Sequence, residues 1–175
     1  WPDAHFATGL AAGDEICQSR AGLAGLPNAT EYRAWLSDAV DDAYCRVNLK
    51  AGKMVDNCGE PALPHLAGAW WRTDGEPFGA SIPYLVHPEQ RVLNPPRVDE
   101  FGHNVSVDEF LWTGTSFMGS VGSNTCADWV SAAAGTTGDT GWTDMTSVGW
   151  TSFGGNPCSS SGHLLCFETH LGDPL

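Results

Sequence analysis

Six cysteines, at positions 17, 45, 58, 126, 158 and 166, are the residues whose chemistry is easiest to recognise in this sequence. An even number suits three disulfides, which persist in oxidising compartments. A structural zinc site would favour closely spaced CxxC pairs, and the spacing from Cys158 to Cys166 is too wide for one. We therefore expect disulfide bonds and an extracellular or cell-surface location. The spacing alone does not choose among the possible pairings.

Metal ligands and cofactor sites are less evident. The histidines, at positions 5, 65, 87, 103, 163 and 170, show neither HxH nor HxxxH spacing. Asp3 and His5, near the start of the sequence, could contribute to a zinc site, but surface or hydrogen-bonded histidines are the simpler interpretation. We predict neither a metal site nor a cofactor.

Hydrolase patterns are also weak. Ser116 lies in "GTSFMG", where the second glycine comes one residue too late for GxSxG. The acidic pairs Asp41–Asp42 and Asp99–Glu100 are adjacent, so in an extended chain their side chains point apart. Glu168 could be buried and perturbed, but a carboxylate that binds backbone amides explains it equally well. We expect no catalytic residues and no enzyme activity.

Aromatic residues are the strongest binding signal. Trp35, Trp112 and Trp129 lie in segments that resemble a known family, described below, and this resemblance implies that they belong to the core. Five others lie in irregular, glycine- or proline-rich stretches and are the ligand-binding candidates: Trp70, Trp71, Tyr84, Trp142 and Trp150. Such rings stack on sugars or form hot spots for protein binding. Burial in a core poor in regular structure is the alternative for each of them.

The bulk composition limits the function classes. The chain has 175 residues, which suits a single domain over 1–175. Its 8 Lys and Arg against 21 Asp and Glu give a net charge of −13, which excludes nucleic acid as a partner. No apolar run approaches the roughly 18 residues of a membrane helix, so we expect no membrane insertion. The start at Trp1, without a signal peptide, suggests a mature, processed form.

The elements that must position these residues are short. Residues 13–26 predict a helix that begins at Gly13 or Asp14 and carries Cys17, and residues 38–49 a short helical turn. Strands are predicted in residues 31–38, 69–74, 82–86, 91–93, 109–116, 125–132 and 162–170. Prolines make residues 59–109 an irregular excursion from the same core. The expected class is α+β.

Several segments together resemble a known family: "LAAGDEICQSRAGLAGL", "EYRAWLSD", "WWRTDGEPF", "FLWTGT", "CADW" and "NPCSSSGHLLCFE". The chain is similar to a bacterial extracellular domain family of uncharacterised function, related to collagen-derived endostatin and so to the C-type lectin-like fold. The resemblance implies a short, mostly antiparallel sheet with one or two helices and large loops. It also implies an outer disulfide, Cys17–Cys166, that encloses an inner one, Cys126–Cys158. Cys45–Cys58 is then a third, local pair.

The resemblance raises the question of calcium binding. Lectins of this fold bind calcium with acidic and amide side chains on a long loop between two core strands. Here "FLWTGT" and "CADW" would be those strands, and residues 116–125 between them contain no carboxylate. Calcium needs several oxygen ligands, some of them anionic. We therefore expect the domain to be calcium-independent.

The function expected from these observations is a secreted or surface-attached bacterial binding or adhesion module without catalysis. Its partner would be an extracellular polysaccharide or a matrix or host protein, bound through residues 59–104 and 138–155. The charge of −13 favours neutral or cationic ligands. One alternative is a structural subunit that self-associates into a surface layer or fibre, and another is an extracellular enzyme of unrecognised type.

Overall fold

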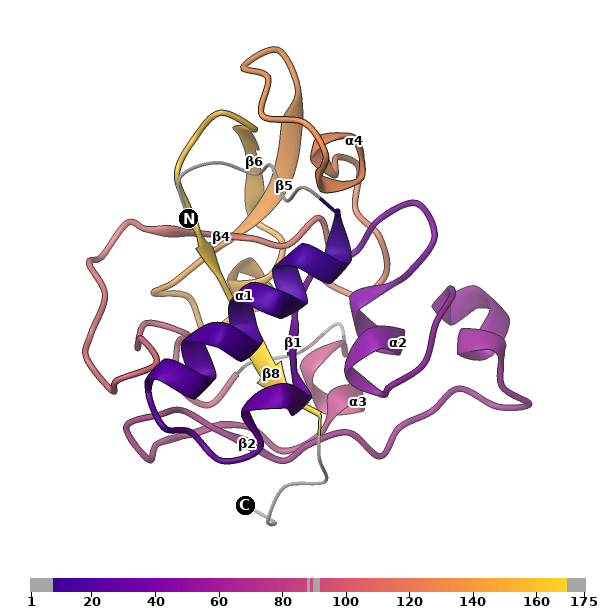
Figure 1. Ribbon diagram of the computed structural model, residues 1–175. Helices are drawn as coiled ribbons and strands as arrows, with labels where there is room; N and C mark the ends of the chain where they lie inside the picture. Colours follow the sequence, from indigo (N-terminus) through magenta and orange to yellow (C-terminus); the bar gives the residue numbers. More distant parts are fainter. Residues whose placement is uncertain (1–7, 88, 90–91, 170–175) are drawn as a thin grey trace.

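A mixed α+β architecture is seen in the computed structural model, which describes residues 8–87, 89 and 92–169. In that part of the chain, one long helix and several short ones surround three small sheets (Figure 1). The helices are α1 (Leu10–Leu23), η1 (Ala29–Glu31), α2 (Ala43–Val47), η2 (Met54–Gly59), α3 (Ile82–Leu85), α4 (Cys126–Trp129) and η3 (Val148–Trp150). The strands are β1 (Tyr32–Ala34), β2 (Trp70–Trp71), β3 (Pro77–Gly79), β4 (Phe110–Trp112), β5 (Thr137–Trp142), β6 (Gly154–Pro157), β7 (His163–Leu164) and β8 (Cys166–Glu168).

The sheets are mostly antiparallel. β6, β5, β4 and β7 form a four-stranded sheet in that order, in which only the β4–β7 pair is parallel. β2 pairs with β3, and β1 pairs with β8 with Tyr32 opposite Glu168. The β1–β8 pair brings an early strand against the last one, so α1, which precedes β1, lies over both (Figure 1).

The first helix begins at Leu10, three residues earlier than expected. Its buried positions, Leu10, Gly13, Cys17 and Ala21, recur every three or four residues, as one face of a helix requires. Gly13 allows close contact with β1 and the residues after it, because a Cβ atom there would lie 3.3 Å from Ala34 Cβ and 2.8 Å from Leu36 Cδ1. Packing against β1 thus extends the helix beyond the predicted start.

A buried arginine joins α1, β1 and α2. Arg46 of α2 is 8% exposed, and its guanidinium donates hydrogen bonds to the carbonyls of Ala34 and Leu36, at 2.8 and 2.9 Å. It also pairs with Asp14 of α1, whose carboxylate accepts a hydrogen bond from Ala34 N–H. Asp14 therefore binds β1 and α2 and does not cap its own helix.

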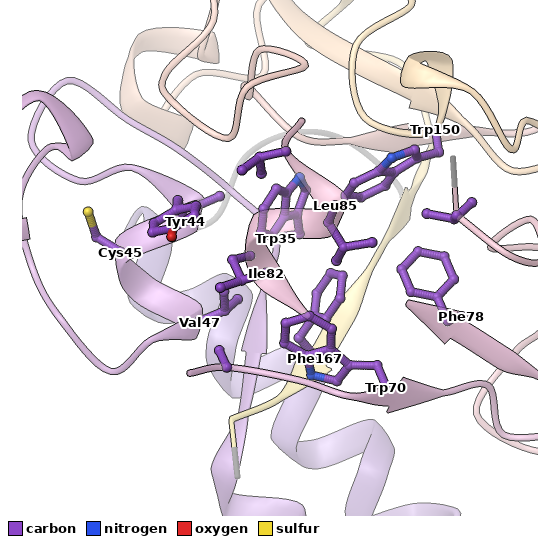
Figure 2. Close-up of a cluster of buried hydrophobic side chains, with 14 of the residues drawn as sticks. Trp35, Tyr44, Cys45, Val47, Trp70, Phe78, Ile82, Leu85, Trp150 and Phe167 are labelled. Carbon is purple, nitrogen blue, oxygen red and sulfur yellow. The ribbon is translucent and has the colours of Figure 1, made fainter. Parts of the chain in front are cut away.

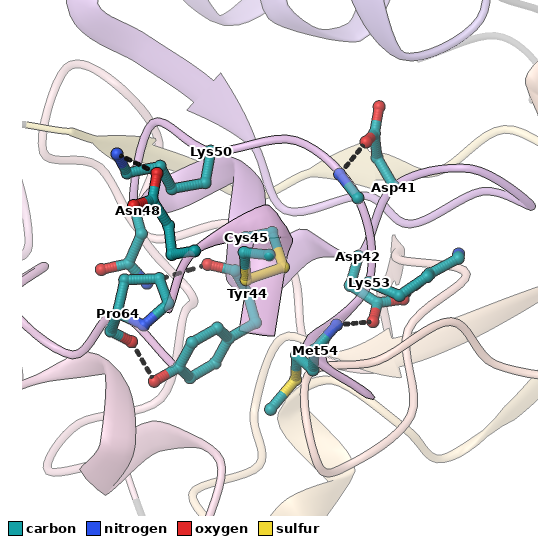
Figure 3. Close-up of a disulfide and its surroundings, with 12 residues drawn as sticks. Asp41, Asp42, Tyr44, Cys45, Asn48, Lys50, Lys53, Met54 and Pro64 are labelled. Atoms are coloured by element: carbon teal, nitrogen blue, oxygen red, sulfur yellow. Dashed lines mark hydrogen bonds and ion pairs between the residues drawn. A yellow bond between two sulfur atoms is a disulfide. The ribbon is translucent and has the colours of Figure 1, made fainter. Parts of the chain in front are cut away.

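Three disulfides connect the elements: the two pairs that the resemblance implies and the local pair formed by the two remaining cysteines. Cys17–Cys166 joins α1 to β8 over 149 residues, and Cys126–Cys158 spans 32 residues. The local Cys45–Cys58 bond spans 13 residues and lies close to Tyr44, whose hydroxyl donates to Pro64 O (Figure 3).

The larger buried cluster is aromatic (Figure 2). Trp35 packs against Trp150 with ring centroids 5.4 Å apart, and Trp70 meets Phe167 edge-on at 4.8 Å. Trp70, Phe78, Ile82 and Leu85 enter this cluster from residues 59–109, so the irregular excursion shares the core of the rest of the chain. The second cluster includes Leu10, Cys17, Leu36, Trp112 and Trp129.

Two predicted strands are wrong. Residues 82–85 form the helix α3, because Ile82 and Leu85, three residues apart, are both fully buried while Tyr84 between them is 43% exposed. Within residues 125–132, α4 is a left-handed turn: all four of its residues have φ between 50° and 67°. Residues 91–93 include Arg91, which lies outside the described residues, and Val92 and Leu93 form no strand. Among the residues described, no helix has both the length and the apolar character needed to cross a membrane.

Candidate ligand-binding groove

A groove of about 940 Å³ runs beside the last strand. One wall is the face of α1 that carries Ile16, Arg20 and Ala21. The floor is residues 163–168, and the opposite wall combines residues 69–73 with the segment 96–105. A volume of this size is in the range of small-molecule and cofactor sites.

Two bonds fix the α1 and β2 walls to the floor. Cys17–Cys166 joins α1 covalently to β8. Trp70 Nε1 donates a hydrogen bond to Glu168 O at 2.8 Å, which holds β2 against the end of β8. The disulfide and the indole thus set the width of the groove at two places.

Two arginines hold the segment 96–105 in place. Arg72 donates to Pro95 O at 2.9 Å and forms an ion pair with Asp74. Arg20 of α1 forms an ion pair with Glu100, and its guanidinium carbon lies 6.0 Å from the ring centroid of Phe101. The Arg20–Glu100 pair therefore joins α1 directly to the opposite wall.

One end of the groove carries a phenol and a carboxylate. Glu168 accepts a hydrogen bond from Asn28 Nδ2 at 2.6 Å. Burial raises the pKa of Tyr32, and the nearby negative charge of Glu168 raises it further. At neutral pH the site therefore presents a neutral phenol beside an acidic side chain.

The acidic groups near the other wall are not arranged for general acid catalysis. The pKa of Asp74 is lowered, chiefly by its hydrogen bond with Arg72. For Asp99, burial raises the pKa, but hydrogen bonds from the backbone amides of His103 and Phe101 and the charge of His103 lower it overall. A general acid that works near neutral pH needs the opposite shift.

The hydroxyl and imidazole groups of the groove are also engaged. Thr73 and Thr143 donate their hydroxyl protons to the carbonyls of Asp99 and Glu109. His163 Nε2 lies 2.9 Å from Glu109 Oε2, and this half-exposed pair joins β7 to the residue before β4. Neither threonine is thus hydrogen-bonded to a base that would activate it as a nucleophile.

The five aromatic candidates do not form one site. Trp71 lines the groove and is 49% exposed, whereas its neighbour Trp70 is 6% exposed and packs into the core. Successive residues of β2 point to opposite faces, which explains why only one ring is available. Trp150 is fully buried in the same core (Figure 2). Trp70 and Trp150 are therefore buried, which is the alternative that the sequence left open for each of them.

The other two candidates lie away from the groove lining. Tyr84 is exposed on α3. Trp142 is partly buried at the end of β5, where its ring meets Phe153 edge-on at 5.5 Å. Trp71 is thus the one candidate of the five that combines exposure with a place in the groove.

Arg20 and Arg72 gave no signal in the sequence, and Glu168 was considered there only as a carboxylate that could be buried and perturbed. Arg20, Arg72 and Glu168 come from α1, the residue after β2, and β8, which the disulfide and hydrogen bonds bring together. No spacing pattern connects positions so far apart in the chain. An even number of cysteines indicates cross-links, but it does not indicate what a cross-link encloses.

Metal candidates have little support in the described part of the chain. No group of three or more His, Cys, Asp or Glu side chains is placed there to hold a metal ion. Asp3 and His5 lie outside the described residues. In the loop 116–125, the amides of Ser123 and Asn124 bind the Asp139 carboxylate, so this acid serves to hold the loop against β5.

The groove must be interpreted from its own geometry, since no protein-family model and no curated protein matches this chain. It offers an exposed indole, an acidic end and a floor of β-strand. Its walls are joined by a disulfide and an ion pair. These features suit the binding of an elongated ligand in a preformed site.

Proposed function

We propose that this chain is a secreted or surface-attached bacterial recognition module that binds an extracellular polysaccharide or protein in the groove. It acts without catalysis and without calcium. The observation that carries this proposal is the groove itself, with a volume of about 940 Å³ and with Trp71 exposed in its wall.

An endostatin-like, C-type lectin-like fold is part of the same proposal. It is supported by the disulfide between the first helix and the last strand, and by the second disulfide, Cys126–Cys158, within its span. The four-stranded sheet around β4 and β5 and the long loops suit that fold. Proteins that share one fold often differ in function, so the functional argument rests on the groove and not on the fold.

Recognition is supported by the mixture of groups in the groove. Trp71 offers a rigid aromatic surface, which contributes large contact area with little loss of side-chain entropy. Arg20 and Glu100 satisfy one another within the protein, so ligand binding need not leave a buried charge unpaired. The disulfide Cys17–Cys166 keeps the site formed before the ligand arrives, which lowers the entropic penalty of binding.

The absence of catalysis is proposed because the reactive groups of the groove have structural partners. The hydroxyls of Thr73 and Thr143 donate to carbonyls, and the pKa of Asp99 is lowered. A catalytic site instead holds titratable groups whose pKa values are shifted toward the working pH.

The test is binding of the purified protein to arrays of glycans and extracellular proteins, with Trp71→Ala and a matched control. Phe117→Ala removes another exposed aromatic ring, 41% exposed and outside the groove lining. Trp71→Ala should weaken binding by about fivefold or more, the effect of a hot-spot residue. Phe117→Ala should leave binding unchanged, and both variants should keep the melting temperature.

Three results would contradict the proposal. Binding that Trp71→Ala does not affect would place the contact surface elsewhere. Chemical conversion of a bound polymer would favour the enzyme alternative. Concentration-dependent assembly in sizing chromatography, without binding to any arrayed ligand, would favour the self-associating structural subunit.

A further inference from the structure

The last strand, β8, has one edge paired and one edge facing away from its partner. Hydrogen bonds from Thr169 N to Glu31 O and from Trp35 N to Leu165 O flank the β1–β8 register. In an antiparallel pair, hydrogen-bonded residues alternate with residues whose backbone groups point outward. Phe167 is therefore bonded to β1, whereas the N–H and C=O groups of Cys166 and Glu168 point away from it.

The outward edge of β8 borders the groove. All six consecutive residues 163–168 line it, although successive side chains of a strand point to opposite faces. The groove must therefore reach the backbone as well as the side chains. Cys166 and Glu168 are both partly exposed.

Most of the outward backbone groups lack hydrogen-bond partners. Within residues 8–87, 89 and 92–169, neither the N–H nor the C=O of Cys166 has one, and neither does the N–H of Glu168. The C=O of Glu168 accepts from Trp70 Nε1. Such an edge provides the hydrogen bonds that an added strand would use.

We propose that the groove binds an extended peptide segment of net positive charge, which adds to the outward edge of β8 as a further strand. This inference rests on the proposed recognition function and specifies the class of its ligand. The added strand pairs with Cys166 and with the N–H of Glu168, and β-augmentation of this kind gives affinity through the main chain.

The walls of the groove suit alternating side chains of such a strand. Cys166 points toward α1, as its disulfide with Cys17 shows, so every second ligand residue meets Ile16 and Ala21 on that face. Phe167 points to the other side, where Trp70 packs against it. The remaining ligand residues face the β2 wall, and Trp71 extends that wall with an exposed ring.

Charge selects a basic segment. The Glu168 carboxylate lies at the end of the edge, and the chain as a whole carries a net charge of −13. Complementary charge increases the rate of association and disfavours acidic ligands.

A second folded copy of this chain fits less well. The edge of β8 lies between α1 and the segment 96–105, which the Arg20–Glu100 pair connects. A single extended segment can enter between these walls. A sheet of a second copy would bring its own covering layers between these walls, whereas a single extended segment brings none.

The decisive experiment selects peptides of about ten residues from a random display library with the immobilised protein, a length that spans roughly 33 Å when extended. Selected peptides should carry net positive charge and should no longer bind the Trp71→Ala variant of the protein. Each residue of the best peptide is then N-methylated in turn. N-methylation at the one residue whose N–H meets the Cys166 carbonyl should weaken binding about fivefold or more, since it blocks a main-chain hydrogen bond, and methylation at its two neighbours should have little effect.

Two measurements on the protein complete the test. Peptide binding should slow hydrogen exchange at the amides of Cys166 and Glu168 and leave Phe167, already bonded to β1, unchanged. Glu168→Gln should weaken binding of a basic peptide by about two- to fivefold at low salt. Glu15→Gln, an exposed position on α1 outside the groove lining, makes the same charge change and should have no effect.

The outcomes separate this inference from the proposed function. Trp71-dependent peptides that lose no affinity on N-methylation at any single position, or ligands that are exclusively polysaccharides, overturn strand addition and leave the recognition function standing. Failure to find any Trp71-dependent ligand, peptide or glycan, overturns both.

Discussion

Replacement of Arg46 by methionine should strongly destabilise the folded protein, although the sequence of the variant still suits the same helices and strands. The side chain is 8% exposed, donates hydrogen bonds to the carbonyls of Ala34 and Leu36, and forms an ion pair with Asp14. Methionine keeps much of the volume but removes every donor. The carbonyls of Ala34 and Leu36 and the Asp14 carboxylate then lose buried partners.

The expected magnitude follows from the burial of the pair. Removing one partner of a buried ion pair destabilises by about 3–5 kcal/mol. Here Asp14 keeps the Ala34 N–H and Arg33, but the buried carbonyls of Ala34 and Leu36 also lose their donor. For a domain of this size each kcal/mol lowers the melting temperature by about 2–4 °C, so the melting temperature should fall by about 10 °C. Urea unfolding followed by tryptophan fluorescence measures the free energy directly.

Arg33→Met is the matched control. Arg33 lies 3.5 Å from the same carboxylate, but its side chain is 28% exposed, so its loss should cost about 1 kcal/mol or less. If Arg46→Met and Arg33→Met destabilise equally, or if Arg46→Met stays within 1 kcal/mol of wild type, the argument that this guanidinium holds α1 onto β1 is refuted. If α1 no longer packs firmly on β1 in Arg46→Met, the groove loses its α1 wall, so this variant should also bind ligands more weakly.

Three further predictions concern the cross-links, the phenol and calcium. Replacing Cys17 and Cys166 by alanine should destabilise by about 5 kcal/mol, against about 3 kcal/mol for Cys45 and Cys58, because the longer loop restricts the unfolded chain more; the reverse order in urea unfolding would contradict this. Burial and Glu168 raise the pKa of Tyr32 above 10.0. The stability that the neutral Tyr32 phenol gives the folded state is therefore present below pH 10.0 and is lost as the pH rises through the raised pKa. Tyr32→Phe should therefore lose less stability than wild type on alkaline titration, and an identical loss would refute the shift. Millimolar calcium, added to metal-stripped protein, should leave the melting temperature unchanged, whereas an increase would reveal a site for a ligand of the folded state.

The sequence by itself determined the features that depend on local pattern. The helix around Cys17 follows from apolar residues every three or four positions, and the structure shows it from Leu10 to Leu23. Strands at residues 32–34 and 110–112 lie within the alternating or aromatic segments that predicted them. An even number of cysteines in an acidic chain predicted disulfides, and the three bonds are present.

Short apolar segments were decided by packing and not by pattern. Residues 82–85 have the composition of a strand, but burial of Ile82 and Leu85 on one side requires helical spacing. The left-handed turn α4 is held by burial of Cys126 and Trp129 and by the hydrogen bond from Asp128 N to Thr125 Oγ1. Left-handed backbone costs L-residues about 1–2 kcal/mol each, so no local propensity would predict it.

The candidate site was decided almost entirely by tertiary structure. Composition suggested a binding surface rich in tryptophan, but whether Trp70 or Trp71 faces the groove depends on which side of β2 meets Phe167. The free edge of β8 exists because β1 pairs with its other side and because Cys17–Cys166 places α1 beside it. Local residue preferences depend on neighbours along the chain. A groove between the first helix and the last strand forms only when residues from nearly opposite ends of the sequence come into contact.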